Sequence, residues 1–112
     1  MEESILISIK KLLGIAKEYN NFDTDIIIHI NTAFLNLNQL GVGPSEGFRI
    51  KDDKTTWNMF LNDSEKFDAV KTYIYLKVKL VFDPPLNSAV LEATKQSITE
   101  LEWRLNVQAE SK

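Results

Sequence analysis

One stretch of this chain, residues 67–85 with the sequence FDAVKTYIYLKVKLVFDPP, limits the possible folds more than any other. It is the most apolar segment, so we expect it to lie in the middle of the hydrophobic core. Pro84 and Pro85 end the segment, because neither residue can donate a backbone hydrogen bond. The segment contains no group of side chains typical of a catalytic site. The function of the chain must therefore be sought on its surfaces.

This central segment fits two kinds of secondary structure. Between Tyr73 and Phe82, apolar residues alternate with tyrosines and lysines, and such alternation is typical of a strand. A helical spacing also runs through the segment, and it places five apolar residues on one face: Phe67, Val70, Ile74, Val78 and Val81. We predict a helix over residues 64–82, because a strand of about 19 residues would be unusually long. No other segment has the β character to pair with such a strand.

Local signals predict two helices before this one. The apolar residues within 5–13 recur at helical spacing, and Gly14 follows them as a natural helix end. A second helix is expected to begin after Asp23, a good N-cap, and to end at Gly41. Its apolar residues cover one broad face. Ile28 and Leu35 fall outside that face, and a second contact surface would explain them.

A last helix follows the two prolines, and Asn87 or Ser88 is its expected cap. Its inward stripe is narrow and consists of Leu91, Thr94, Ile98, Leu101 and Leu105. Trp103 and Val107 lie on the opposite side of this helix. Tryptophan is enriched in interface hot spots, which favours a partner-binding role for Trp103. The alternative is that another element of the same domain, such as a long loop, covers it.

Residues 41–55 form a long connection that holds three of the four glycines. Loops beyond about 12 residues are commonly functional or mobile. Within it, Phe48, Arg49 and Ile50 are predicted to form one short strand, half of a small hairpin. A short helix with Trp57 is expected to follow. The predicted fold is therefore mainly α: a small bundle of four to five helices, with room for a short β-hairpin in the long loop. We expect a single helical domain over residues 1–107 and a frayed tail over residues 108–112.

Composition excludes several classes of function. The chain of 112 residues has a formal net charge of −3 and no run of more than two basic residues, so it should bind DNA poorly. It has no cysteine, which excludes disulfides, thiolate nucleophiles and cysteine-bound zinc. No apolar run reaches about 18 residues, so we expect no membrane-spanning helix.

Candidate catalytic and metal-binding residues are few. His29 is the only histidine, and Asp25 lies four residues before it on the same helical face. A metal site needs three or four ligands, so a capping acid beside a histidine at the edge of the core is the favoured interpretation. The adjacent pair Asp52–Asp53 lies in a polar loop, and Glu100 and Glu102 point in different directions on a helix. We therefore expect no enzymatic activity and no cofactor or metal.

A nucleic-acid platform is a further hypothesis. Aromatic and basic residues interleave in the central segment at Tyr73, Tyr75, Lys77 and Lys79. On a strand they would resemble a surface that stacks single-stranded bases. On a helix they scatter around the axis, and this second interpretation is favoured.

Four stretches of the chain resemble a known family: FDTDIIIHINTAFLNLNQLGVGP, TTWNMFL, AVKTYIYLKVKLVFDPP and ELEWRLNV. They are similar to head–tail connector proteins, also called head-completion or adaptor proteins, of tailed bacteriophages and of prophages of Gram-positive bacteria. The similarity covers almost the whole chain, and its motifs are apolar and structural. The resemblance implies a helical fold with a small β element in a loop. It also implies a structural role without a catalytic reaction.

The resemblance implies partners as well. Proteins of this kind form a ring with copies of themselves beneath the portal protein, extend the DNA channel and carry the stopper or tail-completion protein. DNA would pass through without specific binding. The chain would occur in the host cytoplasm during assembly and then at the head–tail junction of the virion, with no membrane partner. The last helix tends to dock on the portal in this family, which implies residues 98–107 here.

A ring requires head-to-tail contacts, so each subunit must carry two different adhesive surfaces. The candidate interface residues are Ile28, Leu35, Phe48, Arg49, Trp103, Arg104 and Val107. Two alternatives stay open at this point. The chain could be a cytosolic helical interaction module, such as a regulatory adaptor, or a binder of single-stranded nucleic acid.

Overall fold

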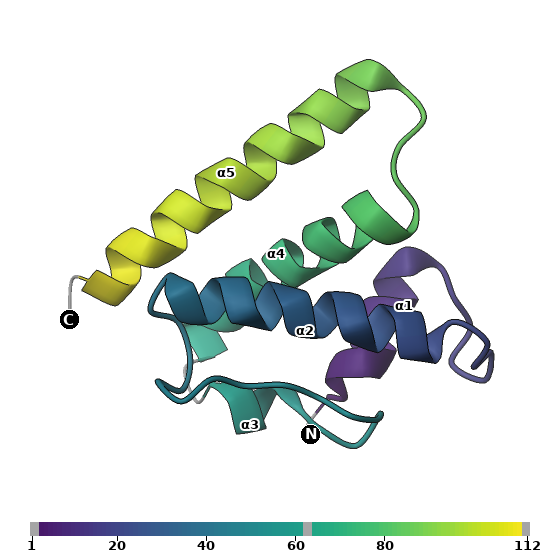
Figure 1. The fold of residues 1–112 in the computed structure, drawn as a ribbon, viewed down its shortest axis with the longest axis horizontal. Helices are drawn as coiled ribbons and strands as arrows, with labels where there is room; N and C mark the ends of the chain where they lie inside the picture. The colour runs from purple at the N-terminus through teal and green to yellow at the C-terminus, as the bar shows by residue number, and fades with distance from the viewer. Residues whose placement is uncertain (1–2, 62–63, 111–112) are drawn as a thin grey trace.

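The computed structural model describes residues 3–61 and 64–110, and for residues 64–67 it describes the backbone alone. Over these residues the chain forms five helices, which Figure 1 shows: α1 (Ile5–Leu13), α2 (Asp23–Gln39), α3 (Trp57–Phe60), α4 (Ser64–Phe82) and α5 (Ser88–Glu110). The described part of the chain has no β-sheet, and Ser4 and Thr56 form an isolated antiparallel bridge. The predicted small helical bundle is confirmed.

Helix α4 is the centre of the bundle. It contacts α1, α2 and α5, and in Figure 1 it lies between α2 and α5. Its buried face consists of Val70, Tyr73, Ile74 and Val78. The helical interpretation of residues 64–82 is therefore confirmed at both ends. Val81 was expected on the same face but is exposed, whereas Leu80 and Phe82 on either side of it pack against the core. The side chain of Phe67 lies outside the described residues.

Local signals fix several helix ends, and those at Gly14 and Asn87 are as predicted. The Ser4 side chain accepts a hydrogen bond from the backbone N–H of Ile7 at 3.2 Å. Gly14 ends α1 with φ of 81°, a left-handed conformation that glycine adopts without steric cost. Asn87 caps α5, since its side-chain oxygen accepts hydrogen bonds from the N–H groups of Ala89 and Val90 at 2.8 and 3.1 Å.

The start of α2 differs from the prediction. Asp23 is the first residue of the helix instead of its cap, and Phe22 precedes it without a side-chain capping bond. The reason is Lys10, whose side chain is almost fully buried. Its ammonium lies 2.9 Å from Asp23 Oδ1 and donates to the carbonyl oxygens of Lys17 at 3.1 Å and Tyr19 at 2.8 Å. A buried charge needs such partners, so the carboxylate of Asp23 pairs with Lys10.

The predicted hairpin in the long loop is wrong: residues 41–55 form no strand, and Phe48, Arg49 and Ile50 have no strand partner. A side chain of α2 takes the partner's place. Asn31 accepts a hydrogen bond from the N–H of Ile50 at 2.8 Å and donates one to its carbonyl oxygen at 3.0 Å. A carboxamide offers one acceptor and one donor group, as a peptide unit does, so Asn31 satisfies the loop backbone without a second strand.

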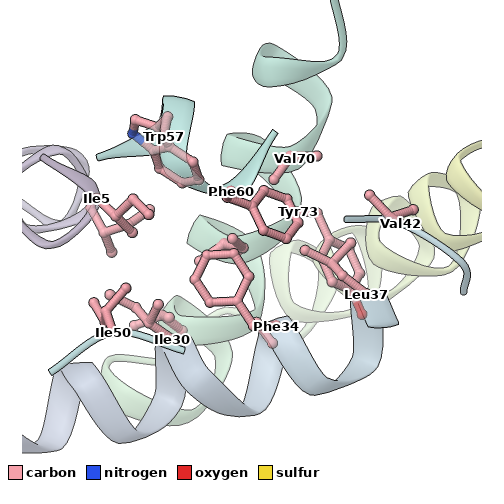
Figure 2. Close-up of a cluster of buried hydrophobic side chains, with 14 of the residues drawn as sticks. Ile5, Ile30, Phe34, Leu37, Val42, Ile50, Trp57, Phe60, Val70 and Tyr73 are labelled. Carbon is pink, nitrogen blue, oxygen red and sulfur yellow. The ribbon is translucent and has the colours of Figure 1, made fainter. Parts of the chain in front are cut away.

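The loop is also tied to the core by aromatic side chains. Phe48 packs against Phe34 of α2 and Phe60 of α3, with ring centroids 5.0 and 5.1 Å apart. Figure 2 shows Phe34 and Phe60 within the buried cluster. At the other end of the loop, Trp57 donates its indole N–H to the Ser8 side chain at 2.9 Å and so joins α3 to α1. The loop therefore follows a defined course along α2.

The two halves of α5 differ in their support. The second half buries Ile98 and Leu105. Glu102 accepts a hydrogen bond from the Tyr73 hydroxyl at 2.7 Å, and Asn106 donates one to the carbonyl oxygen of Leu40 at 3.1 Å. None of residues 88–97 is buried. Residues 108–110 of the expected frayed tail are the last residues of α5, and fraying in solution stays a prediction. Residues 111–112 lie outside the described residues.

Candidate interaction surfaces

The candidate catalytic residues do not come together. Among the residues that the structure describes, no three histidine, aspartate or glutamate side chains lie close enough to hold a metal ion. His29 is half-buried at the edge of the α2–α4 contact, in a small hollow that it shares with Lys77 and Val81. Asp25 is exposed one turn before it. This position is the one expected for a histidine at the edge of the core.

The nucleic-acid platform is contradicted by the position of Tyr73, which is 0% exposed. Burial raises the pKa of its hydroxyl above the usual range, and the hydrogen bond and negative charge of Glu102 act in the same direction. Lys77 lies over the Tyr73 ring, 6.0 Å from its centroid, and Lys79 pairs with Asp83 at 3.0 Å. A buried tyrosine cannot stack on a base, so these side chains form no common binding surface.

One candidate surface is a groove between α2 and the long loop. We call it the loop groove; it has a volume of about 510 Å³ and is lined by Asn31, Thr32, Phe34, Leu35, Asn38, Glu46, Gly47, Phe48 and Arg49. Asn38 of α2 fixes the loop at one end of the groove, because its side chain donates hydrogen bonds to the carbonyl oxygens of Pro44 and Ser45 at 3.1 and 3.3 Å. Three predicted interface residues, Leu35, Phe48 and Arg49, are thus brought together although the sequence separates the first from the others.

The loop groove combines apolar and charged groups. Leu35 is 58% exposed and stands at the wall of the groove, Phe48 is half-buried, and Phe34 is fully buried beneath the groove floor. Glu46 and Arg49 supply one negative and one positive side chain, and both residues are exposed. Ile28 is 55% exposed and lies two turns before Leu35 on the same side of α2, although it does not line the groove. Both apolar residues predicted outside the α2 core face are therefore exposed.

A second candidate surface is the outward side of the second half of α5. We call it the α5 outer face; its members are Glu100, Trp103, Arg104 and Val107. Trp103 is 66% exposed, so the long loop does not cover it and the alternative of burial within the domain is wrong. A shallow hollow beside the indole is lined by Lys95, Gln96, Thr99 and Glu100. Arg104 pairs with Glu100 at 2.9 Å, and both side chains are largely exposed.

Leu86, just before α5, and Val90, in its first turn, are exposed apolar residues that the sequence analysis did not single out. Leu86 directly follows the two prolines, and Val90 lies outside the predicted inward stripe of the last helix. That mismatch with the stripe is the signal that identified Trp103, and it applies equally to Val90.

The seven predicted interface residues therefore fall into two groups on different elements. Ile28, Leu35, Phe48 and Arg49 belong to the side formed by α2 and the long loop, and the other three belong to α5. In Figure 1, most of α5 lies on the other side of α4 from the long loop, and only the C-terminal end of α5 comes close to the start of the loop, at Gly41. Such a molecule offers two unlike surfaces, the arrangement that head-to-tail association requires.

Comparisons with known proteins place this fold in one family. No curated protein and no solved structure matches the chain. Of the described helices, none is long and apolar enough to cross a membrane. The phage connector protein family matches residues 5–112, a span that includes all five helices, the loop groove and the α5 outer face. The chain therefore belongs to the phage connector protein family.

Proposed function

We propose that this chain is the subunit of a ring that sits beneath the portal at the head–tail junction of a tailed phage or prophage of a Gram-positive host. The ring extends the DNA channel and gives the stopper or tail-completion protein its attachment platform. The protein assembles in the host cytoplasm, becomes part of the virion and carries out no reaction. Family membership supports the connector role, and the two exposed surfaces support the ring.

The observation that carries the ring proposal is the separation of the loop groove from the α5 outer face. An interface between identical surfaces would close a dimer, whereas two unlike surfaces on one subunit generate a ring when the rotation closes. Each surface here has an exposed large apolar residue, Leu35 in one and Trp103 in the other. Each also has an adjacent exposed arginine, Arg49 or Arg104, suited to a polar rim.

The charge of the chain fits a channel through which DNA must slide. The formal net charge is −3, and several lysines are engaged: Lys10 with Asp23, Lys71 with Glu3 and Lys79 with Asp83. A wall with this balance would hold the phosphate backbone weakly, because non-specific affinity for DNA comes from unneutralised basic groups. DNA therefore passes through the channel without being bound tightly by the subunit.

The second half of α5 supplies the segment directed toward the portal. The family resemblance assigns residues 98–107 to this role, so the portal contact would border the ring contact that the α5 outer face makes. This half of the helix is fixed to the core by Ile98, Leu105 and Glu102, so a load applied at the portal would reach α4 directly. The stopper or tail-completion protein would then meet the opposite end of the ring.

Purified heads test the proposal. Heads from a phage that lacks this chain should carry portals but fail to join tails, and adding the purified protein should restore tail joining. Electron microscopy should show an added ring beneath the portal. Heads that join tails equally well without the chain would overturn the proposal. They would favour a cytosolic interaction module instead.

Replacement of the exposed tryptophan sharpens the test. Trp103→Ala should leave the helical circular dichroism unchanged, because the side chain is 66% exposed and contributes little to the core. Assembly on heads should weaken by about 30-fold or more, the loss expected for an interface hot spot. Met59→Ala is the matched control, since Met59 is 60% exposed on α3 and lies outside both surfaces. Loss of the fold in Trp103→Ala would identify Trp103 as a core residue and contradict the proposal.

A further inference from the structure

We infer that the contact that closes the ring is the insertion of Trp103 of one copy into the loop groove of the next copy. The inference rests on the proposed function, because it names the partner of the two surfaces described above. A second copy of this chain is the occupant of the groove, and the α5 outer face is the part that enters it. The following observations support the inference.

The indole and the groove match in chemical type. Trp103 exposes two-thirds of a large aromatic side chain on a helix whose opposite side is fixed to the core. The groove offers an aromatic and aliphatic lining in Phe48 and Leu35, above the buried ring of Phe34. Aromatic rings that meet in tilted or edge-on geometry gain affinity beyond the area they bury. A volume of about 510 Å³ lies within the usual range for sites that enclose a group of this size.

The polar groups of the groove suit tryptophan in particular. The indole N–H is a donor without an acceptor function, and it needs a partner when it is buried. Glu46 lines the groove and carries a carboxylate that can accept this hydrogen bond. Arg49 lines the same groove, and a guanidinium over an indole ring is a favourable cation–π contact.

The charges that flank the two surfaces complement each other. Glu100 and Arg104 lie one turn apart beside Trp103 and pair at 2.9 Å in the single copy. Glu46 and Arg49 flank the groove. When the surfaces meet, Glu100 can pair with Arg49 and Arg104 with Glu46. An interface with one acid and one base on each side fixes register and disfavours other partners.

The hollow beside Trp103 offers a second place where the two copies can interlock. It is lined by Lys95, Gln96, Thr99 and Glu100, so it lies along the same outward side of α5. Leu35 projects from the wall of the loop groove and is 58% exposed. With the indole inside the groove, Leu35 reaches this hollow. Each copy then contributes one projecting apolar side chain and one recess, and the two recesses lie on different elements.

Cysteine cross-linking tests the contact directly, because the chain has no cysteine of its own. One preparation carries Leu35→Cys in the groove wall, and the other carries Thr99→Cys, in the hollow that Leu35 is expected to reach. The two are mixed in equal amounts, bound to portal-bearing heads and oxidised gently. Because each copy has a single cysteine, any bond between the two variants joins different copies. We expect a covalent dimer that contains one copy of each variant.

The matched control replaces Thr99→Cys by Val90→Cys. Val90 is also exposed on α5, but it lies more than three turns before Trp103. This control should give little mixed dimer. Charge reversal gives a second readout: Arg49→Glu in the groove variant should lower the yield of mixed dimer about two- to fivefold. Glu100→Arg in the α5 variant should restore that yield.

The outcomes separate the inference from the proposed function. If the protein binds to heads and the mixed dimer forms above the Val90→Cys control, the contact is supported. If the protein binds to heads but the mixed dimer does not form, the contact is wrong, Trp103 faces the portal or another partner, and the proposed function stands. If the protein does not bind to portal-bearing heads at all, both proposals fail.

Discussion

The long loop is irregular but packed against the core, whereas the first half of α5 is helical but has no buried residue. Residues 41–55 have no helix or strand, yet they are fixed to the core by Asn31, Asn38 and Phe48. Residues 88–97 are entirely helical, yet none of them is buried. Backbone hydrogen bonds in a helix are satisfied locally, whereas a loop must find partners elsewhere in the molecule. The presence of regular secondary structure therefore says little about whether a segment is packed against the core.

This difference bears on how a connector subunit can serve an assembly. A loop held by the core keeps the loop groove in shape before any partner arrives, so binding there loses little conformational entropy. A helix with few tertiary contacts opens more easily and can adjust to its surroundings. We therefore expect the groove to act as the preformed surface and the start of α5 to act as the adaptable one.

The largest expected effect on stability comes from adding a side chain where the loop backbone passes close to α3. A Cβ atom at Gly43 would lie 2.3 Å from the Phe60 ring, and the residue has φ of +88°. Gly43→Ala should therefore lower the free energy of unfolding by about 3 kcal/mol or more, from the clash and the backbone strain together. Chemical denaturation measures this change.

Gly47→Ala is the control for strain alone. Gly47 has φ of +96°, and a Cβ atom there would meet nothing within 4 Å. We expect it to cost about 1 kcal/mol. Equal costs at the two glycines would mean that the loop is not packed against Phe60, and the contrast with α5 would then disappear.

A smaller effect is expected from the side chain that replaces a strand partner. Asn31→Ala removes both hydrogen bonds to Ile50, at 2.8 and 3.0 Å, and leaves a buried backbone without its partner. The free energy of unfolding should fall by about 2 kcal/mol. Hydrogen exchange at the Ile50 amide should also become faster. Gln39→Ala, at an exposed position of the same helix, should change neither quantity. Unchanged protection of Ile50 would contradict the role given to Asn31.

The sequence predicted the features that depend on neighbouring residues and missed a contact between distant ones. The helical assignment of residues 64–82, the end of α1 at Gly14 and the Asn87 cap were predictable, because each depends on residues a few positions apart. The bonds between Asn31 and Ile50 span 19 positions and left no trace in the local pattern. The sequence therefore suggested a hairpin where the loop is bound to α2 by a side chain.

The candidate surfaces show the same limit. Helical periodicity placed Ile28, Leu35, Trp103 and Val107 off the core faces, and all four are exposed. Periodicity alone left open whether the long loop covers Trp103. The loop lies about 50 positions earlier in the chain, and no local pattern fixes its path. The loop groove itself required the structure, because it joins α2 to residues whose course no local rule predicts.

An intermediate effect is expected where the second half of α5 meets the core. Tyr73→Phe removes the hydrogen bond to Glu102 and should lower the free energy of unfolding by about 1 to 2 kcal/mol near neutral pH. The pKa of Tyr73 is raised in the folded state, so above about pH 10 the unfolded chain loses a proton that the folded chain keeps. The wild-type protein should therefore lose stability as the pH rises through this range.

The variant lacks this titration, so its disadvantage should shrink between about pH 9 and pH 11. Denaturation of both proteins across that range measures the difference. Glu102→Gln is a useful companion, because it keeps an acceptor for the hydroxyl but removes the negative charge that helps to raise the pKa of Tyr73. A disadvantage of Tyr73→Phe that stays constant with pH would show that the hydroxyl is not buried as described.

The smallest effect on stability is expected at the start of α5. Val90 in the first half of α5 is 51% exposed, so Val90→Ser should change the free energy of unfolding by less than about 0.5 kcal/mol. Leu105→Ala, which truncates a buried leucine in the second half of the same helix, should cost about 2 to 5 kcal/mol. Denaturation of the two variants side by side compares the two halves of α5 directly. If Val90→Ser cost as much as Leu105→Ala, the start of α5 would belong to the core, and its adaptability in the assembled ring would have no physical basis.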